Sequence, residues 1–439
     1  MRPPRKWESA ALAAADKRHV WHPFTPMRDW CAPEHEPLIL VEGEGALLRD
    51  SEGREYIDGN SSIWTNIHGH NHPRINAAIR DQLEAVAHTS FLGFTNPAAI
   101  ELAEAIVRLF PPQTLSRVFF SDDGSTGMEV ALRMVEQHWR LRGSARAQFV
   151  SFRGAYHGDT AGAASLGANA MFKNGPEGWY FPSSQVGSVS ELEAIFPDEE
   201  QAVAAVVIEP LIQGAAGMKL WPSGTLAALR KWCDRSGALL IADEVMTGFG
   251  RTGTMFAFEQ ENAIPDILVL GKALTGGYLP LALTVVTEKI FEPFLGEDRS
   301  ASTLFYGHSY TGNALACAAA KASLEIFETE DVLRKLADKI EFLRATLAPL
   351  RGLPAVLEIR QCGFIAAVEL KAVAGARLGA AVCEAARQYG LLTRPIHDTI
   401  VLMLPYCVTE QQISQAVEAI RLALQEVCDK LPTPARHAS

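Results

Sequence analysis

The sequence of 439 residues has few cysteines, no long hydrophobic run and no excess of positive charge. Its seven cysteines are scattered and never form a Cys-x-x-Cys pair, so the pattern favours neither a disulfide framework nor a thiolate zinc site. No apolar run approaches the roughly 18 residues of a membrane span. The formal net charge of −11 gives no net attraction to nucleic acid or anionic lipid. We therefore expect neither a nucleic-acid partner nor a membrane partner.

The remaining composition is that of a globular protein. Hydrophobic residues make up 48% of the chain and charged residues 21%, which excludes disorder as its main state. Charged residues interrupt the short apolar stretch near the N-terminus, so this stretch is unlike a secretory signal, and we expect a cytoplasmic protein. The length predicts about three domain-sized units or one large two-domain enzyme.

Short continuous apolar runs recur through the middle of the chain, at residues 118–120, 149–152, 204–208, 239–242 and 267–270. Continuous rather than alternating runs are typical of strands buried on both faces. Helical patterns separate them, and the clearest places one apolar stripe from Met128 to Trp139, with Thr126 and Glu129 as an expected capping box. Strands that alternate with helices predict an α/β fold with a mainly parallel, doubly wound sheet.

The two ends of the chain follow a different pattern. Residues 45–58 predict a hairpin, because a turn cluster separates two short β-type runs. After about residue 325, long amphipathic helices and two strand-like runs predict a smaller α+β domain. We therefore assign residues 1–59 to the N-terminal segment of the small domain, 60–325 to the large domain, and 326–439 to the C-terminal part of the small domain.

Polar residues follow several of the predicted strands, at the sheet edge where open parallel sheets bind ligands. Gly124 and Ser125 lie between a strand and the amphipathic helix, so the free N–H groups of the helix start could bind a phosphate. An ordinary helix cap is the alternative. Asp243 follows the run at 239–242, and Lys272 follows the run at 267–270. An acid and a lysine are thus expected at the same edge.

These groups match the needs of pyridoxal phosphate. A carboxylate such as Asp243 could keep a ring nitrogen protonated, and a lysine of lowered pKa such as Lys272 could form an imine with an aldehyde. The cofactor is an electron sink that the protein must orient. Tyr156 follows another strand and could stack on a flat ring, although simple packing is the alternative. Without the phosphate site, an ion pair between Asp243 and Lys272 would be the simpler interpretation.

Two other patterns resemble binding motifs without their context. Residues 248–253 match Gly-x-Gly-x-x-Gly, but residues 243–247 separate them from the strand and no helix pattern follows, so we predict a glycine-rich loop. His68, His70 and His72 alternate in a turn that offers no helical ligand pair and no nearby Cys or Glu. We expect no metal site there.

With these residues in place, the chain resembles the class III (subgroup II) aminotransferases of the fold type I pyridoxal phosphate enzymes over essentially its whole length. The matching blocks occur in the order of the family, at residues 120–126, 155–160, 208–210, 241–253, 270–277 and 307–313. The resemblance implies the fold type I architecture, pyridoxal 5'-phosphate as cofactor, and small-molecule substrates.

The resemblance also implies roles for single residues. Lys272 would be the Schiff-base lysine and proton shuttle, Asp243 would bind the pyridine nitrogen, and Tyr156 would stack on the ring. Gly124 and Ser125 would bind the phosphate.

Further roles follow from the same resemblance. Ser309 stands where the family commonly has a threonine that reaches the phosphate of the other subunit, which implies a homodimer with shared active sites. Glu209 would support the cofactor site.

Within the family, residues 18–27, 61–64 with 68–70, and 393–395 are similar to the members that aminate 8-amino-7-oxononanoate in biotin biosynthesis. Arg394 would bind the carboxylate of that keto acid. Residues expected to line the substrate pocket are Trp64, Phe24, Ile63 and Gly307. A broad ω-amino acid or amine transaminase is the closest alternative, and a mutase or racemase of the same fold is a second one.

The sequence departs from the family in three places. Members that use S-adenosylmethionine as amino donor tend to carry a tyrosine at the place of Phe24 and a second tryptophan at the place of Ile63. Because both are changed here, we expect lysine to be a better donor than S-adenosylmethionine. The connection between Gly167 and Val203 is also shorter than in the usual members.

Overall fold

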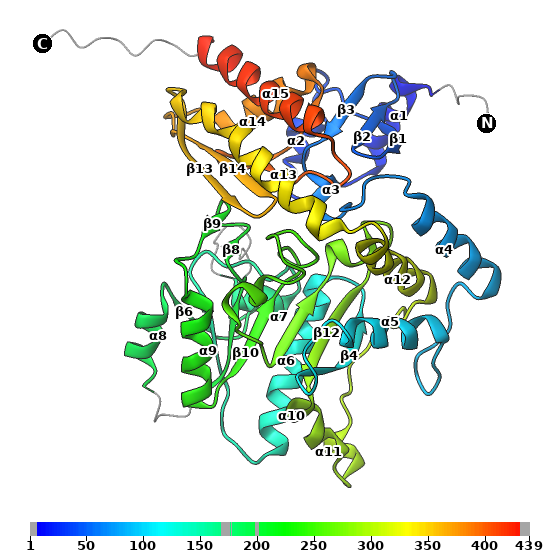
Figure 1. Ribbon diagram of the computed structural model, residues 1–439, viewed down its shortest axis with the longest axis vertical. Helices are drawn as coiled ribbons and strands as arrows, with labels where there is room; N and C mark the ends of the chain where they lie inside the picture. Colours follow the sequence, from blue (N-terminus) through cyan, green and yellow to red (C-terminus); the bar gives the residue numbers. More distant parts are fainter. Residues whose placement is uncertain (1–6, 168–175, 177, 198–201, 431–439) are drawn as a thin grey trace, which may run out of the picture.

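The computed structural model describes residues 7–167, 176, 178–197 and 202–430, and its larger part surrounds a seven-stranded sheet (Figure 1). The strand order is β4-β12-β11-β10-β7-β5-β6. In that order the strands are β4 (Leu115–Ser121), β12 (Ala282–Thr287), β11 (Ile267–Leu270), β10 (Leu239–Asp243), β7 (Val203–Ile208), β5 (Gln148–Phe152) and β6 (Ser184–Val186). All the apolar runs that predicted buried strands lie in this sheet.

The sheet is mainly parallel, as predicted, but it contains one reversed strand. β10 is parallel to β7 and β11, and β5 is parallel to β6 and β7. β12 is antiparallel to both β11 and β4. The sequence did not reveal this reversal, because the composition of a buried strand does not depend on its direction.

Both faces of the sheet are covered by helices, which explains the continuous apolar runs. In β10, Leu239 and Ile241 belong to one hydrophobic cluster together with α6 (Gly124–Leu141). Leu240 and Ala242 point to the other face, into a cluster with α9 (Thr225–Ser236). The other helices of the larger part are α4 (Pro73–Ala85), α5 (Pro97–Val107), α7 (Ala161–Leu166), α8 (Val189–Ile195), α10 (Glu288–Phe291), α11 (Arg299–Ser302) and α12 (Ala314–Thr329).

The start of α6 corrects the predicted capping box. The N-cap is Asp123, whose side chain accepts a hydrogen bond from the N–H of Thr126, while the Thr126 hydroxyl accepts one from the N–H of Asp123. Thr126 is therefore the third residue of the helix rather than its cap. Glu129 instead accepts hydrogen bonds from the N–H groups of Gly162 and Ala163.

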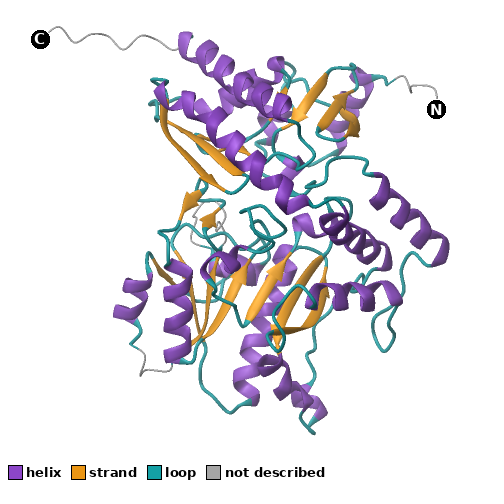
Figure 2. Cartoon of the chain, viewed as in Figure 1, coloured by secondary structure: helices purple, strands orange, loops and turns teal. Residues whose placement is uncertain are grey.

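The smaller part of the molecule joins the two ends of the chain (Figure 2). One sheet has the order β1 (Leu40–Glu44), β2 (Leu47–Asp50), β3 (Glu55–Asp58), β15 (Leu391–Leu392). β2 and β3 form the predicted hairpin, and β15 pairs with β3 in parallel. This pairing brings residues from both ends of the chain into one sheet, and the division into residues 1–59, 60–325 and 326–439 stays a prediction.

The second small sheet has the order β13 (Val356–Cys362), β14 (Ile365–Leu370), β17 (Thr399–Leu402), β16 (Pro395–Ile396). The helices of this part are α1 (Ser9–His19), α2 (Met27–Trp30), α3 (Ser61–Trp64), α13 (Val332–Leu347), α14 (Leu378–Ala385) and α15 (Glu410–Asp429), and α13 matches the predicted amphipathic helix. A short hairpin of β8 (Ile212–Gln213) and β9 (Lys219–Leu220) follows β7.

Part of the shortened connection between Gly167 and Val203, at residues 168–175, 177 and 198–201, lies outside the described residues. Among the helices that are described, none combines the length and the apolar composition that crossing a membrane requires.

Candidate active site

A cleft of about 920 Å³ opens at the carboxyl ends of the parallel strands, where the sequence predicted a ligand site. It is lined by most of the residues predicted for the site: Phe24, Ile63, Trp64, Gly124, Ser125, Tyr156, Glu209, Asp243, Lys272 and Arg394. Gly307 and Ser309 are not among the lining residues of this chain. The cleft is also lined by His157, Arg377 and His397, which sequence analysis did not single out.

Lys272 follows β11 and opens a short 3₁₀ turn, η3 (Lys272–Thr275). Its backbone φ of 42° lies in the left-handed region, which is uncommon for a residue with a side chain. Its Nζ lies 4.8 Å from the ring centroid of Trp64, within the range of a cation–π contact. Burial lowers the pKa of Lys272, while the charges of Asp243 and Glu209 oppose that effect. An amine of lowered pKa is a better nucleophile at neutral pH.

Asp243 ends β10 and is held in place by a buried histidine. Its Oδ2 lies 2.7 Å from Nδ1 of His157, and its Oδ1 accepts a hydrogen bond from the N–H of Val245. Both side chains are almost completely buried. Sequence analysis missed His157, because a single histidine in a loop has no spacing signal. Its only indication was its place beside Tyr156 in the matching block at 155–160.

Close packing leaves room only for glycine at the start of α6. A Cβ atom on Gly124 would lie 2.7 Å from a methyl group of Val245, and one on Gly158 would lie 2.3 Å from Oγ of Ser125. Gly124 and Ser125 both line the cleft at the start of this helix, while the N–H of Thr126 is already bonded to the side chain of Asp123. Ser125 Oγ also accepts a hydrogen bond from the N–H of Asp159. This is the geometry of an anion site.

Tyr156 and Glu209 are linked to each other beside Asp243. Glu209 accepts hydrogen bonds from the N–H groups of Tyr156, at 3.2 Å, and Gly214, at 2.8 Å. The hydroxyl of Tyr156 donates to Asp159 at 2.8 Å, and burial raises the pKa of Tyr156. Burial also raises the pKa of Glu209, to about 7.

The glycine-rich loop at 248–253 contacts the small domain. The hydroxyl of Tyr406 donates to the carbonyl of Phe249, and the N–H of Phe364 donates to the carbonyl of Arg251. The Arg251 guanidinium is buried and donates to the carbonyl of Leu404. This loop therefore fixes the small domain against the sheet edge that carries Asp243.

The alternating histidines have separate partners. His68 lies 3.1 Å from Ser323, His70 lies 2.8 Å from Asp58, and His72 lies 3.3 Å from Glu330. In the described part of the chain, no group of His, Cys, Asp and Glu side chains is arranged to hold a metal ion.

Residues 31–424 match the family model of the class III aminotransferases, and the chain belongs to this family. It is therefore a pyridoxal phosphate-dependent transaminase of fold type I, as the resemblance implied. More particularly, the chain is 42% identical to the adenosylmethionine-8-amino-7-oxononanoate aminotransferase of Geobacter sulfurreducens, covering 96% of this chain and 99% of that protein. It is 44% identical to the protein of the same name from Nitratidesulfovibrio vulgaris, covering 96% of this chain and 83% of that protein.

The solved structures that resemble this chain include aminotransferases named for two kinds of activity. The crystal structure of adenosylmethionine-8-amino-7-oxononanoate aminotransferase from Methanocaldococcus jannaschii superposes with a TM-score of 0.91 at 37% identity, covering 95% of this chain and 99% of that chain. An (S)-enantioselective omega-transaminase from Thermomicrobium roseum also superposes with a TM-score of 0.91, at 32% identity, covering 96% of this chain and 100% of that chain.

Proposed function

We propose that this aminotransferase converts 8-amino-7-oxononanoate to 7,8-diaminononanoate in biotin biosynthesis by a ping-pong mechanism. The observation that carries the proposal is the similarity, over nearly the full chain, to relatives named for that activity. Arg394 on the cleft wall supports it, because a guanidinium binds a carboxylate in a bidentate way and the keto acid has one. A ping-pong enzyme binds both substrates in one pocket in turn, so this cation would serve each of them.

The residues around the cleft fit pyridoxal phosphate. The helix start at Gly124 and Ser125 would hold the phosphate through its N–H groups. Tyr156 would cover one face of the ring, and the Asp243 carboxylate, oriented by His157, would keep the ring nitrogen protonated.

When it is bound, the cofactor supplies an electron sink for the carbon that loses its proton. The chain supplies the base: the amine of Lys272, of lowered pKa, would move that proton.

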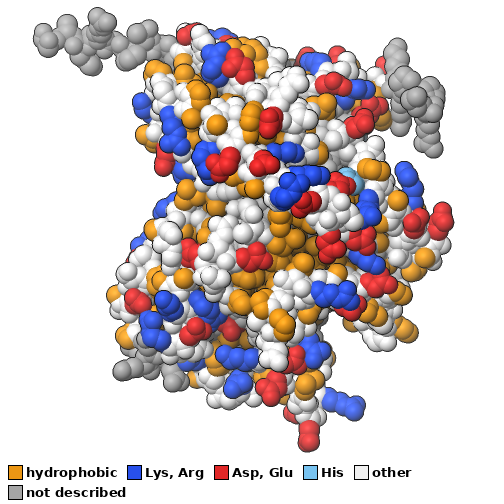
Figure 3. All heavy atoms as spheres, in the orientation of Figure 1, with side chains coloured by type: hydrophobic (Ala, Val, Ile, Leu, Met, Phe, Trp, Pro, Cys, Tyr) orange, Lys and Arg blue, Asp and Glu red, His pale blue; other side chains and the backbone are white. Residues whose placement is uncertain are grey.

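We further propose that the enzyme is a homodimer located in the cytoplasm. Large hydrophobic side chains are exposed on two segments, at Leu92 and Phe94 and at Phe305 and Tyr310. The two segments lie together, because His88 bonds to the carbonyl of Ser309. Apart from these two segments, Figure 3 shows hydrophobic side chains gathered near the middle of the face in view. A second copy could cover such a surface.

Ser309 and Gly307 lie outside the cleft of their own chain, which supports a role for them in the cleft of the partner. Mixed dimers test this. When inactive Lys272→Ala chains are refolded together with inactive Ser309→Asp chains, one site of each mixed dimer should be intact, and activity should return. Two inactive parents that never complement each other would show that Ser309 acts within its own chain.

The substrate is tested by product formation from 8-amino-7-oxononanoate with each of several amino donors. The alternative, an ω-amino acid or amine transaminase, is supported by the similarity to omega-transaminase structures. It would be favoured by turnover of simple amines and none of the keto acid.

The amino donor is a separate question, because the relatives are named for adenosylmethionine, whereas Phe24 and Ile63 led us to expect lysine. Both residues line the cleft. We expect lysine alone to convert the cofactor to pyridoxamine phosphate faster than S-adenosylmethionine at equal concentration. The reverse order would contradict the role given to these two residues.

A further inference from the structure

Trp64, whose ring faces Lys272, lies on a turn with a strained backbone. Three residues of α3 have positive φ angles, namely Ser61 at 43°, Ser62 at 62° and Trp64 at 68°. Residues with side chains avoid this region, so the surrounding structure must hold the turn in place. The strained turn also places the indole ring 4.8 Å from Nζ of Lys272.

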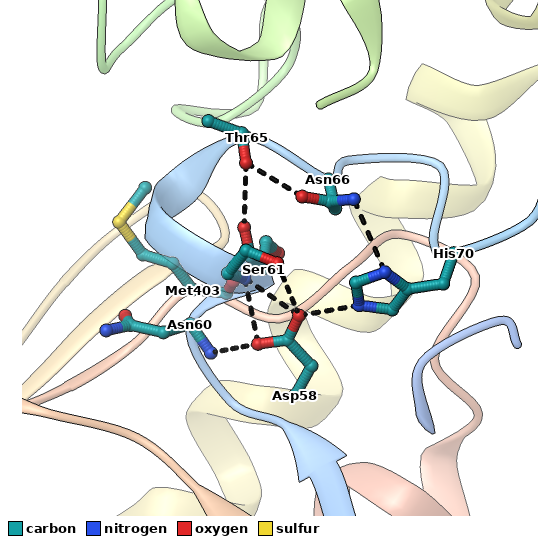
Figure 4. Close-up of polar contacts among 8 residues, drawn as sticks. Asp58, Asn60, Ser61, Thr65, Asn66, His70 and Met403 are labelled. Atoms are coloured by element: carbon teal, nitrogen blue, oxygen red, sulfur yellow. Dashed lines mark hydrogen bonds and ion pairs between the residues drawn. The ribbon is translucent and has the colours of Figure 1, made fainter. Parts of the chain in front are cut away.

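A buried carboxylate holds the middle of this turn (Figure 4). Asp58, the last residue of β3, accepts hydrogen bonds from the N–H of Ser62, at 2.9 Å to Oδ1 and 2.7 Å to Oδ2. It also accepts one from the N–H of Asn60, at 3.3 Å. Figure 4 shows these bonds converging on one carboxylate, which belongs to a residue only 2% exposed. Asp58 therefore satisfies backbone N–H groups that the left-handed turn leaves without helical partners.

The carboxylate is in turn oriented by a histidine. Nε2 of His70 lies 2.8 Å from Oδ2 of Asp58, and Nδ1 of His70 lies 3.4 Å from the amide nitrogen of Asn66. If Nδ1 accepts from this amide, Nε2 carries the proton and donates to Asp58. Thr65 donates to Asn66 at 2.8 Å, which extends the network to the residue after Trp64.

A second contact fixes the indole ring itself. Nε1 of Trp64 donates to Oδ1 of Asn60 at 3.1 Å. The far edge of the ring lies 3.5 Å from the place that a Cβ on Gly214 would occupy, and Gly214 is the residue whose N–H binds Glu209. The hydrogen bond to Asn60 therefore fixes one side of the ring, and the other side packs against the loop that contains Gly214.

We propose that Asp58, His70 and Asn60 are positioning residues that hold Trp64 over Lys272 and so set the fit of the substrate. This inference rests on the proposed role of Trp64 as a wall of the substrate pocket. Asn60 also lines the cleft, and the role we assign to all three is to hold Trp64 and not to act on the reacting atoms. Asp58 and His70 fix the backbone of the turn, and Asn60 fixes the rotation of the ring.

A double-mutant cycle tests the contact between Asn60 and Trp64. Asn60→Ala removes the acceptor, and Trp64→Phe removes the indole donor while it keeps an aromatic ring. We expect Asn60→Ala to raise KM about three- to tenfold, the effect of one hydrogen bond, with kcat nearly unchanged. In the Trp64→Phe background the same substitution should add nothing. An equal rise of KM in both backgrounds, or no rise in either, would overturn the proposal.

Variants of the carboxylate and its histidine test the rest of the network. Asp58→Asn and His70→Ala should raise KM, and His70→Gln, which keeps a donor, should restore much of the loss. Asp50→Asn is the matched control, because Asp50 is also buried at a strand end and accepts bonds from Tyr56 and Arg54 away from the cleft. It should lower thermal stability and leave KM unchanged. A similar KM for both aspartate variants, or no rescue by glutamine, would contradict the proposed role.

Failure of the positioning role can be distinguished from failure of the proposed function. If the unmodified enzyme does not aminate 8-amino-7-oxononanoate, the proposed function fails, and the same cycle is measured with the amine and acceptor that the enzyme does convert. If Asn60→Ala raises KM but Trp64→Phe leaves KM unchanged, Asn60 does not act through Trp64. That result would refute the positioning role alone.

Discussion

Gly124→Ala should weaken cofactor binding far more than it weakens the fold. The added Cβ would lie 2.7 Å and 2.9 Å from the two methyl groups of Val245, about 0.7 Å short of the 3.4 Å at which ordinary contact begins. Overpacking of this kind costs about 1–3 kcal/mol of stability. Alanine in place of glycine in a helix returns up to about 1 kcal/mol. The net loss of stability should therefore be about 1 kcal/mol.

The effect on the cofactor should be larger, because Val245 follows the strand that carries Asp243. Separating Val245 from the helix start moves the phosphate site away from Asp243 and Lys272. A rigid ligand cannot contact both ends after such a displacement, and loss of one hydrogen bond to a charged group costs about 1.5–3 kcal/mol, which is about 10- to 100-fold in affinity. We expect pyridoxal phosphate to bind about 10- to 100-fold more weakly, measured by titration of the cofactor-free protein and followed by protein fluorescence.

Val245→Ala provides the control, since it removes the methyl groups that the new Cβ would strike. The double variant Gly124→Ala/Val245→Ala should bind the cofactor more tightly than Gly124→Ala and nearly as tightly as Val245→Ala. Unchanged affinity in Gly124→Ala, or a double variant that binds no better than Gly124→Ala, would refute the steric reasoning.

Three further predictions follow from the site and from a buried carboxyl group beside it. Lys272→Ala should lose transamination but keep cofactor that denaturation releases, as measured by absorbance after gel filtration. His157→Gln should lower kcat in the native background and have little effect in an Asp243→Asn background, if His157 acts only by orienting Asp243. Glu244, between Asp243 and Val245, is fully buried, and its carboxyl group accepts hydrogen bonds from the N–H groups of Ala257 and Phe258. Burial raises the pKa of Glu244 from 4.5 to about 7, so the folded chain keeps a proton that the unfolded chain releases. As the pH rises from about 4.5 to 7, the free energy of unfolding should fall, and urea unfolding of Glu244→Gln should show a flatter fall.

The sequence was sufficient to predict the cleft, because its main residues directly follow buried strands. Asp243 and Lys272 come at the ends of continuous apolar runs, and ligands of parallel sheets bind at the carboxyl edge, so the two residues are expected at one site from their positions in the sequence. The fold class followed from the same runs. The partner of Asp243 did not, because a contact between residues 157 and 243 depends on the order of β5, β7 and β10 in space.

Other features could not be predicted from the sequence, for different physical reasons. The direction of β12 is set by its connections rather than by its composition, which is apolar like that of its neighbours. The strained turn at Ser61–Trp64 contains neither glycine nor asparagine, the residues that usually indicate a left-handed backbone. Its conformation comes from Asp58, which accepts from the N–H of Ser62, and from Met403, whose carbonyl accepts a hydrogen bond from the hydroxyl of Ser61. Met403 lies more than 300 residues away in sequence.

The pairing of β15 with β3 has a consequence for biosynthesis. The sheet that contains residues 57 and 58 gains its fourth strand only after residues 391 and 392 have been synthesised. During translation, the edge of β3 therefore stays open while more than 330 residues emerge from the ribosome. Open strand edges pair readily with other chains, and contacts between distant residues form slowly. Aggregation during rapid overexpression should begin at this edge, and slower synthesis at low temperature should improve the yield of native enzyme.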